Sequence, residues 1–496
     1  METLGFLLDG FAVALTPLNL ALMVIGCFAG TLIGALPGIG PVNGVAILIP
    51  LTFAMELNPT SALILLCAVY YGCMFGGRIS SILLNIPGDE PAIMTTLDGY
   101  PMALQGKAAE ALAISGVASF IGGTLATVGL TLFAPVLANA AVYFGPADYF
   151  ALYVLAFATI GGIGGANPRK ALLAALFGLM IATVGLDPGT GVARYTLGSF
   201  DLYDGFDPIV AIVGLFAISE VLFFLEGQFA AGGTMIPVGR VLPRWRDIAG
   251  TFGASLRGSG IGFLAGILPG AGASLGAALS YAAEKRLNDR GSFGKGDPRG
   301  VAAPEAGNNA ASGGALIPML TLGVPGSGTT AVMLAMLISL NVQPGPLLFE
   351  RQPEMVWGLV ASLYLANFVL LVMNLPLIGV FTWMLRTPTW VLMPLVVMVS
   401  FLGVFAITNS TFELLVMIGF GLLGFVFRKL EIPLVPVVLG LLLGRDMENN
   451  LRRALAISGG EFDILVSSPI AVGLYGVTAV MLALAFLLSG RAAGRA

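Results

Sequence analysis

Long apolar runs recur along almost the whole 496-residue chain, and they restrict its fold more than any other feature. A helix needs about 20 mainly apolar residues to cross a bilayer, and the chain is 57% hydrophobic and only 10% charged, with a mean hydropathy of +0.95. The alternating polarity of a membrane β-barrel is absent from the sequence. We therefore expect an all-α polytopic membrane protein of about 12 transmembrane helices. Examples of the runs are Pro17–Leu36, Ala109–Leu132, Tyr149–Ile163, Pro208–Leu225, Met355–Leu375, Trp390–Phe405, Leu414–Phe427 and Ile470–Leu488.

Helix-breaking residues interrupt this pattern in matching places. The segments Gly34–Gly44 (GALPGIGPVNG) and Gly266–Gly276 (GILPGAGASLG) both read G-x-L-P-G-x-G-x-x-x-G and lie 232 positions apart. A second pair of segments, Gly76–Ala92 and Gly313–Ala331, follows them and contains Pro-Gly steps 238 positions apart. The sequence therefore predicts two homologous membrane repeats, 1–226 and 258–447, joined by a polar connection at 227–257 and followed by a C-terminal extra span and tail at 448–496.

The charges of two equivalent loops indicate how the repeats are oriented. The loop after the second copy of the motif is rich in basic residues, whereas Phe53–Ser61, after the first copy, has no basic residue and one acid, Glu56. Loops rich in Lys and Arg stay on the cytoplasmic side, so we expect the two repeats to be inverted. The basic residues are Lys285, Arg286, Arg290, Lys295 and Arg299.

The breaks themselves predict a binding site. Proline removes a backbone hydrogen bond and glycine adopts turn conformations cheaply, so each break ends one half-helix and starts another in a re-entrant hairpin. Such backbone survives at membrane depth only where protein covers it or water reaches it. Each restarted half-helix has unpaired N–H groups and about half a positive charge at its N-terminus. Paired breaks in two repeats are typical of a transporter's central site, here one for an anion.

Polar side chains beside the breaks are the expected ligands, because amide and hydroxyl groups bind carboxylates and their oxygens coordinate hard cations. We expect Na⁺, if it is the coupling ion, near Asn43, Asn85, Asn308 and Thr321; protons are the alternative, and no other cofactor is expected. The predicted substrate-binding residues are Gly38, Gly40, Asn43, Ser80, Ser81, Asn85, Pro87, Gly88, Gly270, Gly272, Ser274, Asn308, Asn309, Pro325, Gly326, Ser327, Thr329 and Thr330.

Each of these features also has a structural interpretation. A single Pro-Gly step is often a simple kink, and Ser or Thr in a membrane helix often joins two helices. Arg78 is costly in lipid unless it is partnered or lies at a cavity edge, and Asp89 or Glu90 could be its partner. Glu220 and Glu305 could be either structural or cation-coupled.

Catalysis and nucleic-acid binding find no support in the sequence. The chain has no histidine, so GASLG at 272–276 is not the nucleophile elbow of a serine hydrolase. The three cysteines suggest packing rather than a zinc site or disulfides, and no basic cluster of the kind that grips nucleic acid occurs. The alternatives to a transporter are an anion channel and a membrane-embedded enzyme.

These motifs resemble the large permease subunit, TctA, of the tripartite tricarboxylate transporter family. The resemblance covers most of the chain and is carried by the segments at 34–53, 70–112, 266–286 and 300–334, with similar stretches at 343–349 and 441–455. One departure is Gly307, where the family pattern has alanine before Asn308-Asn309. The resemblance implies a secondary transporter of the bacterial inner membrane that imports citrate or another small carboxylate with a cation. It also implies two partners, a small membrane subunit (TctB-like) and a periplasmic solute-binding protein (TctC-like).

Overall fold

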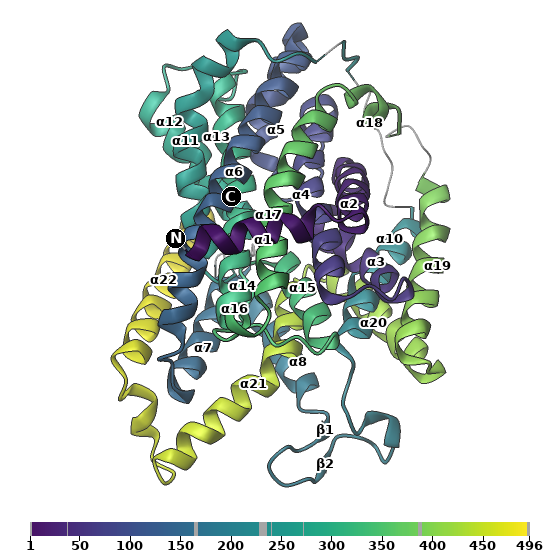
Figure 1. Ribbon diagram of the computed structural model, residues 1–496, viewed down its shortest axis with the longest axis vertical. Coiled ribbons are helices and arrows are strands. Elements are labelled where there is room, and N and C mark those ends of the chain that lie inside the picture. The colour runs from purple at the N-terminus through teal and green to yellow at the C-terminus, as the bar shows by residue number, and fades with distance from the viewer. Residues whose placement is uncertain are drawn as a thin grey trace.

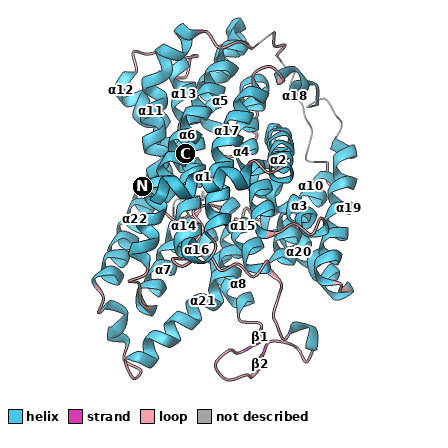
Figure 2. Ribbon diagram, viewed as in Figure 1, coloured by secondary structure: helices cyan, strands magenta, loops and turns pink. Residues whose placement is uncertain are grey.

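Helices dominate the computed structural model, which describes residues 2–36, 38–162, 167–227, 236–239, 241–270, 272–384 and 389–493 (Figure 1). The strands found in these ranges, β1 (Gly185–Leu186) and β2 (Ala193–Arg194), pair antiparallel in one small hairpin at the lower end of the view in Figure 2. The all-α fold class predicted from the sequence is confirmed. Parts of the predicted connection, 228–235 and 240, and of the predicted tail, 494–496, lie outside the described residues.

The helices follow one another in two long series. The first series is α1 (Glu2–Ala14), α2 (Pro17–Ala35), α3 (Gly40–Ala54), α4 (Pro59–Leu84), α5 (Ile93–Met102), η1 (Ala103–Lys107), α6 (Ala108–Ala141), α7 (Pro146–Gly162), α8 (Pro168–Ala182), η2 (Phe200–Leu202), α9 (Pro208–Ile212), η3 (Val213–Ile218) and α10 (Ser219–Leu225). The second is α11 (Trp245–Ile267), α12 (Gly272–Asn288), α13 (Pro298–Gly314), α14 (Leu316–Leu322), α15 (Gly328–Ser339), α16 (Leu348–Arg351), α17 (Pro353–Asn374), α18 (Ile378–Met384), α19 (Thr389–Thr408), α20 (Thr411–Lys429), α21 (Val435–Ile457), η4 (Phe462–Val466) and α22 (Pro469–Ala493).

Six helical segments in the described part of the chain are long and apolar enough to cross a membrane. They are Pro17–Ala35, Pro59–Leu84, Ile93–Ala141, Pro208–Leu225, Pro353–Asn374 and Thr411–Lys429. Shorter apolar helices accompany them, at Thr3–Ala14, Gly40–Ala54, Gly328–Ser339, Met393–Thr408 and Pro469–Ala483. The chain is therefore a multi-pass membrane protein. The total of about 12 spans remains a prediction, because a broken helix can cross the bilayer in two short pieces.

The helices stop and restart at the four predicted breaks. α2 gives way to α3 after Ala35, α4 to α5 after Leu84, α11 to α12 after Ile267, and α14 to α15 after Leu322. The residues that follow α4 and α14, Asn85 and Gly323, lie 238 positions apart and both adopt the left-handed conformation, with φ of 57° and 68°. A residue in this conformation turns the chain out of the helix, and glycine and asparagine adopt it more readily than other residues.

Glycines let the helices next to the breaks pack closely, and the same pattern of glycine contacts occurs in both series of helices. α2 packs against α4 and α11 against α13. Along α2 and α11, a Cβ added to any of six glycines would lie within 2.8 Å of a carbonyl oxygen of the facing helix. Small residues at four-residue spacing permit such backbone contact in membranes. The contacts are Gly26–Leu65, Gly30–Val69 and Gly34–Cys73 on α2 and α4, and Gly258–Ala303, Gly262–Gly307 and Gly266–Ala311 on α11 and α13.

A buried carboxylate of the first series holds a loop of the second. Asp98 on α5 is fully buried, and its Oδ1 accepts hydrogen bonds from the backbone N–H groups of Gly294, Gly296 and Asp297 at 2.8–2.9 Å. Its Oδ2 accepts a bond from the hydroxyl of Tyr281 at 2.9 Å. The basic loop between α12 and α13 is thereby fastened to α5.

The β-hairpin is tied to α21 by charges. Arg452 on α21 donates two hydrogen bonds to Asp187, and Arg194 on β2 forms a salt bridge with Glu448 at 2.9 Å. Hydrogen bonds from the Arg452 guanidinium lower the pKa of Asp187 to about 2. The hairpin is thus an ordered extension of this end of the molecule.

Candidate substrate site between the broken helices

A cavity of about 380 Å³ lies where all four breaks meet. Its volume is within the range of small-molecule sites, which is about 300–1,000 Å³. The breaks contribute Gly38–Asn43, Asp89–Pro91, Gly270 with Gly272–Leu275, and Ser327–Thr329 to its wall. The remaining lining residues are Tyr70 and Met74 of α4, Phe216 of η3, Arg428 of α20, and Ile432–Pro436 around the start of α21.

The first turns of three helices line this cavity. α3 begins at Gly40, α12 at Gly272 and α15 at Gly328, and residues from each first turn face the cavity. The first turn of a helix leaves N–H groups without partners along the helix, and each terminus carries about half a positive charge. The cavity is therefore a place where a negative group meets several favourable dipoles.

Two of the N–H groups that the sequence predicts to be unpaired donate hydrogen bonds within the protein. The N–H groups of Gly270 and Gly272 both donate to the carbonyl oxygen of Gly326, at 3.1 and 3.3 Å. The expectation that these breaks leave their amides unpaired is wrong for these two groups, because the two breaks of the second series close on each other. Ala273 and Ser274, which follow Gly272 in the first turn of α12, remain in the cavity wall.

The start of α15 is fixed by its own side chains. Ser327 Oγ accepts a hydrogen bond from the N–H of Thr330, and Thr330 Oγ1 accepts one from the N–H of Ser327. This reciprocal pair is a capping box. It commits Thr330 to the helix, so that Ser327 and Thr329 are the members of this cluster that line the cavity.

Arg428 is a cavity residue that the sequence analysis did not identify. Its guanidinium forms a salt bridge with Glu220 at 2.5 Å and lies 4.3 Å above the ring of Phe223. Glu220 also accepts a hydrogen bond from Asn43 at 3.0 Å, so the pair is anchored to the first turn of α3. Arg428 lies far from the glycine motifs in the sequence, and only the packing of α20 against η3 and α10 brings it there.

Two carboxylates also line the cavity. Asp89 is 8% exposed, and its Oδ1 accepts a hydrogen bond from the N–H of Ala92 at 3.0 Å. Glu90 accepts one from Ser274 Oγ at 3.3 Å, which links the second break to the third. The site therefore contains both signs of charge.

Several predicted site residues serve packing instead of lining the cavity. The hydroxyls of Ser80 and Ser81 donate to the carbonyl oxygen of Gly77, and Thr321 donates to that of Ile317. Gly88 and Gly326 lie against backbone, since an added Cβ would come 2.7 Å from the Cα of Gly77 and 2.6 Å from the Cα of Ala315, respectively. The predicted residues outside the described lining are Ser80, Ser81, Asn85, Pro87, Gly88, Asn308, Asn309, Thr321, Pro325, Gly326 and Thr330.

The paired asparagines lie in the core. Asn308 and Asn309 on α13 are each 1% exposed. Asn309 donates to the carbonyl oxygen of Glu305, whereas the side-chain oxygens of both asparagines have no hydrogen-bond partner among the described residues. Of the four residues predicted near Na⁺, Asn43 lines the cavity.

Arg78 and Glu305 are buried in the same region. Arg78 donates to the carbonyl oxygens of Phe75 and Leu112 and to the hydroxyl of Ser115. In the described part of the chain, no carboxylate lies within salt-bridge distance of Arg78, so Asp89 and Glu90 are not its partners there. Glu305 accepts hydrogen bonds from the hydroxyls of Thr95 and Ser119, at 2.5 and 3.0 Å. These contacts join α13 to α5 and α6.

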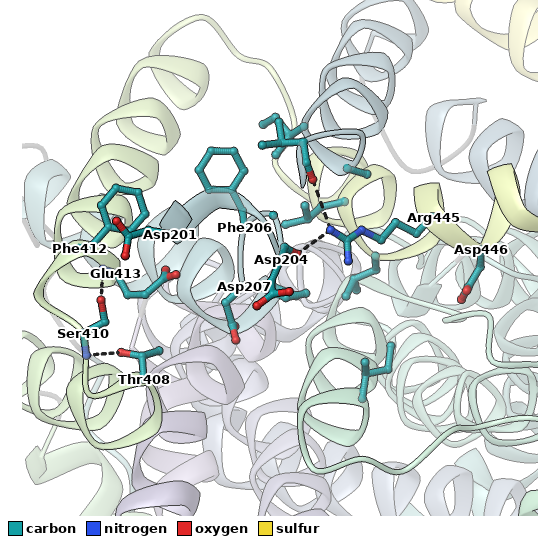
Figure 3. Close-up of a pocket in the computed structure, with 18 residues that line it drawn as sticks. Asp201, Asp204, Phe206, Asp207, Thr408, Ser410, Phe412, Glu413, Arg445 and Asp446 are labelled. Atoms are coloured by element: carbon teal, nitrogen blue, oxygen red, sulfur yellow. Dashed lines mark hydrogen bonds between the residues drawn. The ribbon is translucent and has the colours of Figure 1, made fainter. Parts of the chain in front are cut away.

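A second cavity, of about 550 Å³, is unsuited to an anion (Figure 3). Its wall carries five carboxylates, and the guanidinium of Arg445 donates hydrogen bonds to the carbonyl oxygens of Val184 and Asp204. α20 contributes Glu413 to this cavity and Arg428 to the smaller one, so about 22 Å of helix separates them at 1.5 Å per residue. The carboxylates are Asp201, Asp204, Asp207, Glu413 and Asp446.

The chain also matches a known protein family. The model of the tripartite tricarboxylate transporter TctA family matches residues 20–439. The chain belongs to the TctA family. The resemblance found in the sequence is thereby confirmed. This TctA-family chain is a multi-pass tricarboxylate transporter subunit that belongs to a tripartite system. Membership of a transporter family also favours transport over enzymatic activity.

The similar curated proteins are uncharacterised. An uncharacterised 52.8 kDa protein in the TAR-I ttuC' 3' region of Agrobacterium vitis is 38% identical over 495 residues, which cover 99% of this chain and 98% of that protein. A protein in the TAR-II ttuC' 3' region of the same organism is 39% identical over 231 residues, covering 46% of this chain and 96% of the relative. No solved structure matches the chain.

Proposed function

We propose that the chain is the permease subunit of a cation-driven importer for a small carboxylate, a di- or tricarboxylate such as citrate, in the bacterial inner membrane. The observation that carries this proposal is the cavity in which four helix breaks meet beside Arg428. Its expected partners are a small membrane subunit (TctB-like) and a periplasmic solute-binding protein (TctC-like), in keeping with the tripartite family.

The cavity has the chemistry that such a substrate requires. One carboxylate of the substrate meets the first turns of α3 and α12, where helix dipoles favour negative charge. Arg428 supplies a full positive charge, and its guanidinium can donate to a carboxylate with the N–H groups that Glu220 does not use. Apolar side chains such as Met74 and Phe216 exclude water and strengthen these interactions. Movement of one repeat against the other would expose the site to each side in turn.

Uptake into right-side-out membrane vesicles tests this proposal. Vesicles that carry the chain with both partner proteins should accumulate radiolabelled citrate, tartrate or succinate above the external concentration under an inward cation gradient. Label that only equilibrates across the membrane would identify an anion channel. Label recovered in a chemically altered form would identify an enzyme.

Arg428→Gln tests the site itself. The substitution removes the positive charge and at least one hydrogen bond to the substrate, which is worth about 1.5–3 kcal/mol when one partner is charged. KM for the accumulated carboxylate should therefore rise at least about tenfold. The matched control is Lys429→Gln, because Lys429 is the next residue but pairs with Glu226 outside the cavity lining. Equal effects of the two substitutions on KM would show that Arg428 does not bind the substrate.

A further inference from the structure

Asp89 is the feature of the cavity that an anion site does not explain. The side chain is 8% exposed and lines the cavity. Its Oδ1 accepts the Ala92 N–H, but its Oδ2 has no hydrogen-bond partner in the part of the chain that the structure describes. A buried carboxylate oxygen without a partner is costly unless a proton or a cation occupies it.

The equivalent residue of the second repeat shows that the fold does not need a charge here. Ser327 lies 238 positions after Asp89, the same separation as between the two Pro-Gly steps. Ser327 Oγ accepts the N–H of Thr330, three residues on, as Asp89 Oδ1 accepts the N–H of Ala92. An added Cβ on Gly40 would lie 3.6 Å from the Cβ of Asp89, and one on Gly272 would lie 3.9 Å from that of Ser327. A hydroxyl thus performs the same structural role as the carboxylate.

The surroundings of Asp89 leave its charge poorly compensated. Glu90 is the next residue along the chain. The other titratable groups near Asp89 are Tyr70 and Cys73 of α4 and Glu305 of α13, and none of them carries a positive charge. The single cation in the cavity wall, among the described residues, is Arg428, and its salt bridge is with Glu220. An ionised Asp89 would therefore repel a substrate carboxylate in the same cavity.

We infer that Asp89 is the proton-carrying residue that couples carboxylate uptake to the proton gradient. A proton from the outer aqueous side forms an O–H bond at Oδ2 when the substrate carboxylate binds. Asp89 stays neutral while the site that holds the substrate closes to the outer side and opens to the inner side. The O–H bond then breaks, and the proton passes to water on the inner side. This inference rests on the proposed function, and it assigns the coupling step to one residue.

Transport by Asp89→Asn tests the inference. Asparagine keeps the acceptor for Ala92 and resembles a neutral carboxyl, but it exchanges no proton. In vesicles with both partner proteins, accumulation of labelled citrate, tartrate or succinate driven by an acidic exterior should fall at least tenfold. Counterflow, in which internal unlabelled substrate exchanges for external label, should persist. Asp89→Ser, which copies Ser327, should behave in the same way.

The outcomes separate this inference from the proposed function. The control is Glu354→Gln, which removes an exposed carboxylate outside the cavity lining and should leave accumulation unchanged. Proton-driven accumulation by Asp89→Asn at the wild-type level would overturn the inference, as would wild-type accumulation driven by a Na⁺ gradient and not by a proton gradient. Absence of accumulation by the wild type under either gradient would instead overturn the proposed function.

A second measurement uses the unaltered chain. Dicyclohexylcarbodiimide reacts with protonated carboxyls in apolar surroundings, so the full-length protein in membranes should carry the adduct at Asp89 at pH 7. The adduct, located by mass spectrometry, should decrease as the pH rises and when substrate is present. An Asp89 that stays unmodified at every pH would contradict the inference, even if the Asp89→Asn protein failed to fold.

Discussion

At the scale of single residues, backbone conformation selects the amino acids of the breaks. Gly38 and Gly270 have φ of 85° and 79°, and Gly40 and Gly272 have φ of 67° and 64°. Residues with a Cβ adopt such values at a cost of about 1–2 kcal/mol. Added Cβ atoms at Gly40 and Gly272 would meet ordinary neighbours, so space is not the reason for glycine there. The positive φ places the first turns of α3 and α12 at the cavity.

We predict that Gly38→Val and Gly270→Val each reduce carboxylate uptake more than tenfold. Valine is β-branched and poorly suited to positive φ, so the chain must shift the half-helix start that faces the substrate. The protein should still reach the membrane, because the strain of about 1–2 kcal/mol is local. Initial uptake rates, normalised to membrane abundance, measure the effect.

The matched control is Gly260→Val on α11. No atom lies within 4 Å of a Cβ added there, and the position is exposed. It should transport as the wild type does. Normal transport by both Gly38→Val and Gly270→Val would mean that the breaks serve packing alone and that the substrate site lies elsewhere.

At the scale of elements, the sequence predicted the helix breaks but not every contact made there. Proline and glycine act locally, so the ends of α2, α4, α11 and α14 could be placed from the motifs. Arg428 could not, because its sequence context is an apolar helix and its position depends on how α20 packs. The sequence also could not show that the Gly326 carbonyl would occupy the Gly270 and Gly272 amides.

We predict that Gly262→Ala destabilises the protein by about 1–3 kcal/mol, the usual cost of overpacking. The new Cβ would lie 2.1 Å from the carbonyl oxygen of Gly307, so α11 and α13 must separate. Gly30→Ala should cost a similar amount, because its Cβ would lie 2.3 Å from the carbonyl oxygen of Val69. The apparent melting temperature of the detergent-purified protein is the measurement.

Gly260→Ala is the control for this pair, since it adds the same methyl group to the open face of α11. Alanine is also the better helix former, so the control should be neutral or slightly stabilising. A melting temperature for Gly262→Ala equal to that of the control would show that α11 and α13 are not held in close contact.

At the scale of the whole molecule, the two series repeat one set of contacts. Glycines 232 positions apart meet carbonyl groups 238 positions apart, and the same two separations relate the breaks. The repeat could be predicted because it is written in the sequence. Its connection through Asp98 to the loop at 294–297 could not, because a lone Asp in a helix does not reveal which backbone it will meet.

Cysteine labelling tests whether the repeats are inverted. In a background in which the buried Cys27, Cys67 and Cys73 are replaced, Met55→Cys and Arg290→Cys place exposed thiols in the two equivalent loops. We expect an impermeant maleimide to label them from opposite sides of the membrane, with the cysteine at 290 reached from the cytoplasm, since the loop around it is the basic one. Blocking each thiol first from the other side serves as the control. Labelling of both from the same side would mean parallel repeats, and α3 and α12 would then enter the membrane from the same side. An inverted pair instead brings two half-helix starts to the cavity from opposite sides, as alternating access to one site requires.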